Sequence, residues 1–122
     1  DAGVRDLTTI EEVDEAMAQS GTTLVVVNSV CGCAAGTMRP GVVHALENEA
    51  KPNHVVTVFA GVAFDATKKA REYMLPYPPS SPSVALFKDG QLVHMVERHH
   101  IEGRPAQLIS ANLRAAFDEF CN

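Results

Sequence analysis

Cys31 and Cys33, separated by one residue, are the side chains best suited to chemistry in this sequence. They follow a short apolar run and precede a stretch that we expect to be helical. The backbone N–H groups and the positive end of the helix dipole at such a junction lower the pKa of a thiol, and the thiolate is the attacking species in disulfide exchange. We predict that Cys31, as the first and more exposed cysteine of the turn, is the nucleophile and that Cys33 is the resolving thiol.

Gly32 is the single residue between the two cysteines, and this spacing limits what the pair can do. An internal disulfide would close a very small ring whose geometry Gly32 alone must accommodate, so we expect that bond to be strained. A strained and exposed disulfide is comparatively oxidising. The pair should therefore pass its bond on, or form a mixed disulfide with a partner thiol. This favours disulfide isomerisation or removal of a small thiol over strong reduction of protein disulfides.

Two other interpretations of the cysteine pair stay open. The cysteines could pack as small apolar side chains, although the small residues Ala34, Ala35 and Gly36 that follow make this turn a poor place to bury them. They could instead ligate zinc or an iron–sulfur cluster, which would need further ligands. Cys121 is near the chain end, and His44 is about three helical turns from Cys31. A metal-binding or cluster-binding module is the alternative function, and we expect no metal.

The dipeptide Ser81-Pro82 precedes a predicted strand and is the second candidate element. A cis peptide bond there would bring the turn beside the thiols and leave the backbone of Ser81 free to pair with an extended substrate. A trans proline that only opens the strand is the alternative. The position after the third predicted helix favours the cis form. Gly32, Ser81 and Pro82 are thus the candidate substrate-binding residues.

The order of predicted elements indicates how these residues are positioned. A βαβ unit comes first, then a helix, a β-hairpin and a last helix, which is the order of thioredoxin folds. We expect an α/β protein with a central mixed four-stranded sheet flanked by helices. The expected elements are a helix from Thr9 to Ser20-Gly21, a strand at 24–27, a helix from Cys31 to about Glu49 kinked near Pro40-Gly41, a strand at 54–59, a helix capped by Asp65 and ended by the prolines at 76, 78 and 79, strands at 84–87 and 92–96 joined by Asp89-Gly90, and a helix from about Pro105 to Phe120.

The histidines are expected at the surface rather than in a metal site. His54 opens a strand and His94 lies in the hairpin. His99 and His100 are adjacent, so on a strand they would face opposite ways, which is poor geometry for a shared ligand.

Length and charge limit the remaining possibilities. The 122 residues suit a single domain spanning 1–122. The net charge of −5 comes with no basic block, and no apolar run approaches the roughly 20 residues of a spanning helix, so neither nucleic acid nor a membrane is an expected partner. No secretory signal is visible after Asp1, and three cysteines do not form a secreted-type disulfide framework. A reducing compartment is expected.

Two segments, Val27–Gly36 with Arg39-Pro40 and Ser80–Phe87, closely resemble the bacilliredoxin family. The likeness covers nearly the whole chain, and its Cys-Gly-Cys segment is specific. The resemblance implies a thioredoxin-like fold and a bacterial cytoplasmic protein. It also implies an additional N-terminal helical segment in family members, so that the sequence is trimmed ahead of Asp1.

The resemblance further implies a redox activity. The first cysteine of the motif, here Cys31, attacks a mixed disulfide between a client protein and the small thiol bacillithiol, and takes the thiol onto itself. Weak disulfide isomerase activity is implied as well. The expected partners are S-thiolated client proteins, and no cofactor is expected besides bacillithiol or a similar small thiol as co-substrate.

Overall fold

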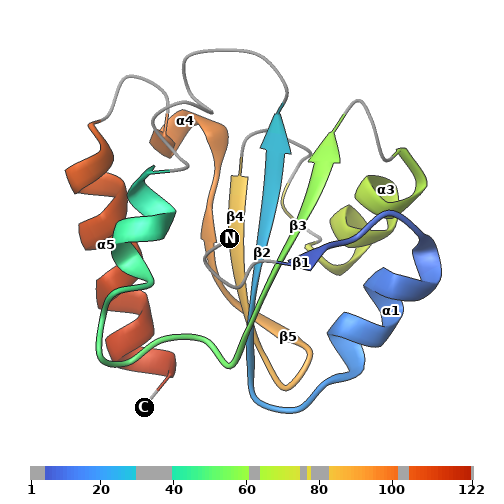
Figure 1. Cartoon of the computed structure of the whole chain (residues 1–122), viewed down its shortest axis with the longest axis horizontal. Coiled ribbons are helices and arrows are strands. Elements are labelled where there is room, and N and C mark those ends of the chain that lie inside the picture. Colours follow the sequence, from blue (N-terminus) through green and yellow to red (C-terminus); the bar gives the residue numbers. More distant parts are fainter. Residues whose placement is uncertain are drawn as a thin grey trace.

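Residues 5–29, 40–60, 64–74, 77, 83–101 and 105–121 are described by the computed structural model. They form a mixed sheet with helices on both faces (Figure 1). Its elements are β1 (Arg5–Asp6), α1 (Ile10–Ala18), β2 (Thr22–Ser29), β3 (His54–Ala60), α3 (Phe64–Tyr73), β4 (Ser83–Lys88), β5 (Gln91–Val96), α4 (Arg98–Ile101) and α5 (Ala106–Phe120). Residues 40–45 are also helical and are drawn in teal in Figure 1.

The central strand of the sheet is β2. The strand order is β1-β3-β2-β4-β5, in which β2 pairs with β3 in parallel and with β4 antiparallel. Val25 pairs with Val56 of β3 on one side and with Ala85 of β4 on the other. The apolar run at 24–27 is at most 5% exposed. The predicted strand at 24–27 is therefore confirmed, and it is central in the sheet and buried on both faces.

Helices cover the two faces of the sheet in pairs (Figure 1). On one face, α1 and α3 enclose a core that includes Val13, Val58 and Phe87. On the other face, the helical segment 40–45 and α5 enclose a core that includes Leu24 and Phe117. The sheet is thus the middle layer of three, which is the α/β arrangement expected from the sequence. No helix of the described residues is both long enough and apolar enough to cross a membrane.

The sheet has a fifth strand that the sequence did not predict. Arg5 and Asp6 form β1, which pairs in parallel with β3, and the N–H of Leu7 donates to the carbonyl of Thr57 over 2.8 Å. Two exposed polar residues show no alternation of apolar side chains, so pattern analysis has no signal to detect. The sheet therefore has five strands instead of the expected four, and the additional strand is β1 at its edge.

The helices depart from prediction in three places. His99 and His100 were expected on a strand, and this was wrong because both lie in the short helix α4. At the start of this helix, the N–H of Glu97 donates to His100 Nδ1. Asp65 does not cap α3, because the helix already begins at Phe64. The helical segment that follows Pro40 ends at residue 45 rather than near Glu49. Its last carbonyls accept tighter i+3 bonds, which close the helix.

The buried faces of α1 and α5 do not include all of their apolar residues. In α1, Val13 and Met17 are buried, whereas Ile10 is 41% exposed. In α5, Leu113 and Phe117 are buried, whereas Leu108 is 54% exposed. Both exceptions stand in the first turn of their helices, at the border of the buried face. The predicted start of α1 is confirmed, because Thr9 and Glu12 form a reciprocal capping box.

The hairpin between β4 and β5 turns at Asp89 and Gly90, as predicted. Both residues have positive φ, 52° and 83°. The N–H of Asp89 donates to the carbonyl of Gly21 over 2.8 Å, and the carboxylate of Asp89 accepts from the N–H of Gly21 over 2.8 Å. The hairpin is thereby fixed to the turn that precedes β2.

Replacing Gly90 by alanine should lower the free energy of unfolding by about 1–2 kcal/mol, because a Cβ makes the left-handed conformation unfavourable. Urea denaturation measures this loss. Gly90→Asn is the matched control, since asparagine has a Cβ but tolerates that conformation, and it should lose less. Equal losses in the two variants would show that the backbone angle is not the cause.

Candidate functional site

The predicted site residues lie outside the part of the chain that the structure describes. Cys31, Gly32 and Cys33 fall in residues 30–39, and Ser81 and Pro82 fall in residues 78–82. The structure does describe β2, which ends just before the first segment, and β4, which begins just after the second.

Both segments attach to the same edge of the sheet. The carboxyl ends of β2 and β3 lie together, with Ser29 facing Ala60, and both arrows point toward that edge in Figure 1. β4 runs the other way and begins there, with Ser83 facing Val27. The chain therefore leaves β2 toward the cysteines close to where it enters β4 from Ser81-Pro82. The pairing of β2 with β4 is what brings the two attachment points together.

The sheet below this edge carries no buried charge within the described residues. Val27 and Val58 are fully buried, and the polar side chains nearby, Asn28, Thr57 and Ser83, are uncharged and at most 8% exposed. The hydroxyl of Thr57 donates to the carbonyl of Val26 over 2.8 Å. In the described core, no carboxylate, lysine or arginine is fully buried. This part of the protein thus offers a nearby thiol no buried charge that would shift its pKa.

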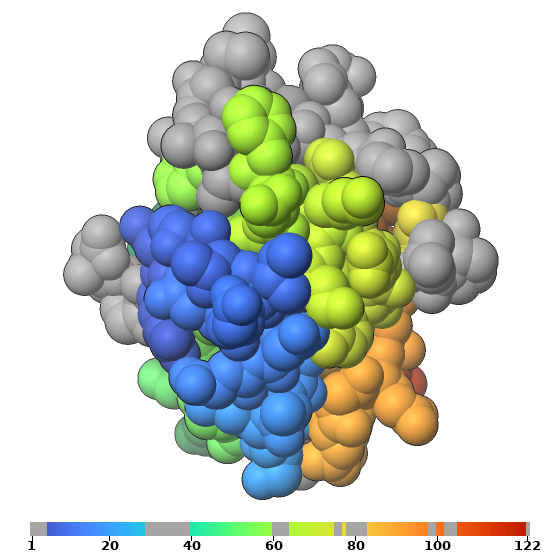
Figure 2. All heavy atoms as spheres, turned by 90° about the vertical axis from the view of Figure 1, so that its right-hand side faces the viewer, coloured from blue at the N-terminus to red at the C-terminus, as the bar shows by residue number. Residues whose placement is uncertain are grey.

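An exposed aromatic ring stands next to the same edge. Phe64 opens α3 only four residues after Ala60 ends β3, and it is 71% exposed. The beginning of α3, in lime, lies in the upper part of the face shown in Figure 2. An exposed apolar ring beside a reactive site can contact a partner. The sequence did not indicate this residue, because one phenylalanine beside a predicted cap has no periodicity to distinguish it from a core residue.

The third cysteine, Cys121, lies at the opposite end of the sheet. It follows α5, where its N–H donates to the carbonyl of Phe117 over 2.8 Å, and its thiol is close to Thr22 and Lys88. Those two residues pair at the start of β2, and the strand from Thr22 to Ser29 spans about 23 Å. Ser29 is only two residues from Cys31, so Cys121 is too far away to share one metal ion with that cysteine.

Burial raises the pKa of the Cys121 thiol, while a hydrogen bond to Thr22 and the charge of Lys88 act in the opposite direction. A raised pKa means a smaller thiolate fraction at neutral pH, so Cys121 should react with iodoacetamide more slowly than an ordinary cysteine. Mass spectrometry of the Cys31→Ala/Cys33→Ala double variant, across a range of pH, measures that rate. The same variant in urea is the control. Equal rates in the folded and unfolded chains would contradict the expectation.

Two of the histidines among the described residues lie next to different polar side chains. His94 Nε2 lies 2.7 Å from Asn112 Oδ1, and His44 Nδ1 lies 4.0 Å from a carboxylate oxygen of Glu47. Within the described ranges, no group of three or more His, Cys, Asp or Glu side chains could hold a metal ion. Cys31 and Cys33 lie outside these ranges.

Comparisons with known proteins identify the family. The family described as Disulphide isomerase matches residues 1–121. A protein of Cytophaga hutchinsonii named Bacilliredoxin is 60% identical over 118 residues, which cover 97% of this chain and 87% of that protein. A Bacilliredoxin of Geobacillus kaustophilus is 52% identical over 121 residues, covering 99% of this chain and 83% of that protein.

Solved structures agree on the fold. Thioredoxin from Malassezia sympodialis has a TM-score of 0.68 at 14% identity, covering 98% of this chain and 91% of that one. Mitochondrial thioredoxin 3 from Saccharomyces cerevisiae has a TM-score of 0.65 at 16% identity, covering 95% and 94%. The expected thioredoxin-like fold is thus confirmed, with one more strand than predicted. From the two sets of comparisons together, the chain belongs to the bacilliredoxin family and has the thioredoxin fold.

Proposed function

We propose that this protein removes bacillithiol, or a similar small thiol, from mixed disulfides on client proteins. Its family and fold make it a thiol-disulfide oxidoreductase. The observation that carries the finer proposal is the pairing of Val27 with Ser83. This pairing joins the segment with two cysteines and the segment with Ser81-Pro82 to adjacent ends of neighbouring strands, so one client can contact both.

The reaction is a thiol–disulfide exchange. The Cys31 thiolate attacks the sulfur of the small thiol in the client mixed disulfide. A new disulfide forms between Cys31 and the small thiol, the bond to the client breaks, and the client cysteine leaves as a thiolate that takes up a proton from water. No net oxidation occurs, because one disulfide replaces another. Cys33 then attacks the Cys31 sulfur, which forms a Cys31–Cys33 disulfide and releases the small thiol as a thiolate. Alternatively, a second small thiol attacks the bound one, which forms a disulfide between the two small thiols and frees Cys31 as a thiolate.

The remaining residues bind the client. The backbone of Ser81, next to Pro82, pairs with an extended client segment, and Gly32 allows the client to approach the thiols closely. Phe64, which is 71% exposed beside the same edge, contacts apolar side chains of the client. We expect the N-terminus of the helix predicted to follow Cys31 to lower the pKa of that thiol.

The setting follows from the same chemistry. The protein acts in the bacterial cytoplasm, on S-thiolated client proteins, with the small thiol as co-substrate and with no other cofactor. Weak disulfide isomerase activity accompanies the exchange, consistent with the description of the matching family. Neither nucleic acid nor a membrane is a partner, in keeping with the net charge of −5 and the lack of a basic block.

Mass spectrometry tests this function directly. The reduced protein is mixed with a client that carries bacillithiol on one cysteine, and the reaction is quenched with acid. We expect one small-thiol adduct, located on Cys31, which is lost in Cys31→Ser and kept or increased in Cys33→Ser. A protein that contains stoichiometric metal and forms no adduct would instead be the metal-binding module.

A further inference from the structure

Asn28 is a buried amide near the end of β2, next to the sheet edge described above. It is 8% exposed, and it follows the apolar run at 24–27 directly. Burying an amide costs free energy unless its polar atoms form hydrogen bonds, so such a residue in an otherwise apolar stretch of strand needs a reason. Packing of the core alone does not supply one, because an apolar side chain would serve there as well.

The side chain of Asn28 lies on the face of the sheet that the helical segment 40–45 and α5 cover. Val27 belongs to the core beneath α1 and α3, whereas Leu24 and Val26 belong to the core on the opposite face. Successive side chains of a strand point to opposite faces, so Asn28 continues the row of Leu24 and Val26. The chain that carries both cysteines joins the end of β2 to the helical segment on this same face. Asn28 therefore lies on the side of the sheet toward which that chain turns.

Asn28 is also close to Cys31 along the chain. Only two residues separate them, and three residues of fully extended chain span at most about 11 Å between Cα atoms. Val27, next to Asn28, pairs with Ser83, which directly follows Pro82. Among the described residues, Asn28 is thus the buried polar residue nearest in sequence to Cys31, and it is close to both segments of the candidate site.

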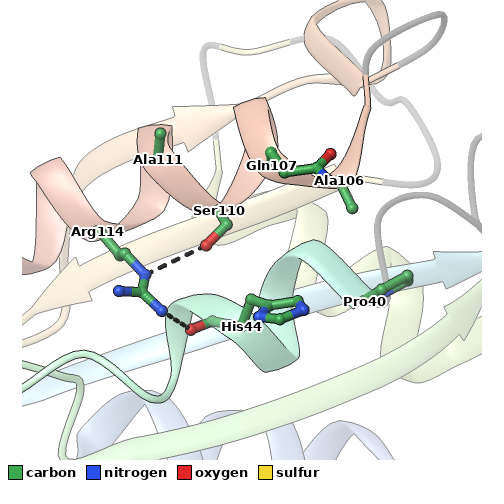
Figure 3. A pocket seen from close by; sticks show the side chains of 7 residues that line it. All are labelled: Pro40, His44, Ala106, Gln107, Ser110, Ala111 and Arg114. Carbon is green, nitrogen blue, oxygen red and sulfur yellow. Dashed lines mark hydrogen bonds between the residues drawn. The ribbon is translucent and has the colours of Figure 1, made fainter.

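The helices on this face bring no buried charge to it in the described part of the chain. Arg114 is only partly buried, and it donates to the hydroxyl of Ser110 over 3.3 Å and to the carbonyl of His44 over 2.6 Å (Figure 3). None of the described titratable side chains of these helices and of the residue after α5 is fully buried; they are His44, His100, Arg114, Asp118, Glu119 and Cys121.

The strands on either side of β2 bring no charge to this edge either. His54 of β3 pairs with Thr23, and Lys88 of β4 pairs with Thr22. Both titratable residues thus lie at the end of β2 that is farthest from the cysteines. Within the described residues, the buried polar side chain that the sheet presents on this face at this edge is therefore the uncharged amide of Asn28.

We propose that Asn28 is a positioning residue for thiol exchange, whose side-chain amide donates a hydrogen bond toward the cysteine segment and stabilises the thiolate of Cys31. This role rests on the proposed function, in which that thiolate attacks the mixed disulfide. A hydrogen bond to the charged form of an acid favours that form. An amide gives this bond without the negative charge of a carboxylate, which would oppose a thiolate. An apolar residue of similar size would give no such bond.

The pH dependence of Cys31 alkylation by iodoacetamide tests this role, with mass spectrometry locating the adduct. Asn28→Asp replaces the amide by a carboxylate of nearly the same size, and it should raise the pKa of Cys31 by about one unit or more. Asn28→Leu removes the donor without adding charge and should raise that pKa by a smaller amount. Asn53→Asp is the matched control: it lies before β3 at the far end of the sheet, where its Oδ1 accepts from the N–H of Thr22, and it should leave the pKa unchanged.

Nuclear magnetic resonance of the parent chain gives a second test that needs no change at Asn28, in case its variants do not fold. The side-chain amide signals of Asn28 should titrate with the midpoint found for Cys31 alkylation. This step should disappear in Cys31→Ala and stay in Cys121→Ala. An unchanged pKa in Asn28→Asp or Asn28→Leu, or amide signals that do not follow Cys31, would overturn the proposal. Neither measurement uses a client or a small thiol, so a failure of thiol transfer alone would contradict only the proposed function.

Discussion

Replacing Cys31 by alanine should reduce the release of bacillithiol from a client mixed disulfide to the rate without protein, whereas Cys33→Ala should keep most of the activity. The first change removes the attacking sulfur, so only the uncatalysed exchange remains. The second leaves the nucleophile in place, and a small thiol in solution can resolve the adduct in place of Cys33. Quantifying the released client thiol over time, with excess bacillithiol present, measures both rates.

The two variants also distinguish between mechanisms. Loss of activity in both would show that Cys33 must resolve the adduct, and activity that persists only in Cys31→Ala would exchange the assigned roles. Cys121→Ala is the matched control, because this cysteine lies near Thr22 at the far end of β2 and should be dispensable. Unfolding curves for all variants exclude a general loss of structure.

Phe117→Ala should lower the free energy of unfolding by about 3–5 kcal/mol. Phe117 is fully buried in the core between α5 and the sheet, together with Leu24 and Leu86. Removing the ring loses its burial and leaves a cavity that the sheet is too rigid to close. Such a loss is a large part of the stability of a domain of this size. Urea denaturation followed by circular dichroism measures it.

Leu108→Ala provides the comparison on the same helix. Leu108 is 54% exposed, so its truncation should change stability by no more than about 0.5 kcal/mol. Both changes shorten an apolar side chain of α5 to alanine, so a difference between them reports burial rather than helix propensity. Similar small losses in both variants would mean that α5 does not pack on the sheet as described.

Much of the fold could be predicted because its signals are local. The apolar run at 24–27, the Asp89-Gly90 turn and the capping box from Thr9 to Glu12 each lie within a few residues of sequence. β1 and α4 were missed because their stability comes from neighbours, namely β3 for β1 and the core that buries Ile101 for α4. Short polar segments of this kind have no periodicity of their own.

Candidate functional residues also differ in whether their signal is local in the sequence. Cys31 and Cys33 are conspicuous in the sequence through residue type and spacing, and the pairing of Val27 with Ser83 is consistent with the place assigned to Ser81-Pro82. The contact between the helical segment 40–45 and α5, in contrast, has no motif. It joins Arg114 to the carbonyl of His44, 70 residues apart in the sequence, and Gly41 lets the same two helices approach each other. Such a contact becomes visible only when the packing is known.

The central position of β2 has a consequence for how the chain folds during synthesis. Val25 faces Val56 and Ala85, residues that the ribosome adds much later. Until the β4–β5 hairpin has emerged, one edge of β2 has no partner, and its apolar side chains stay exposed. We therefore expect truncated chains that end before β4 to aggregate or to bind chaperones. The strand that ends two residues before Cys31 is thus left half-paired in the nascent chain.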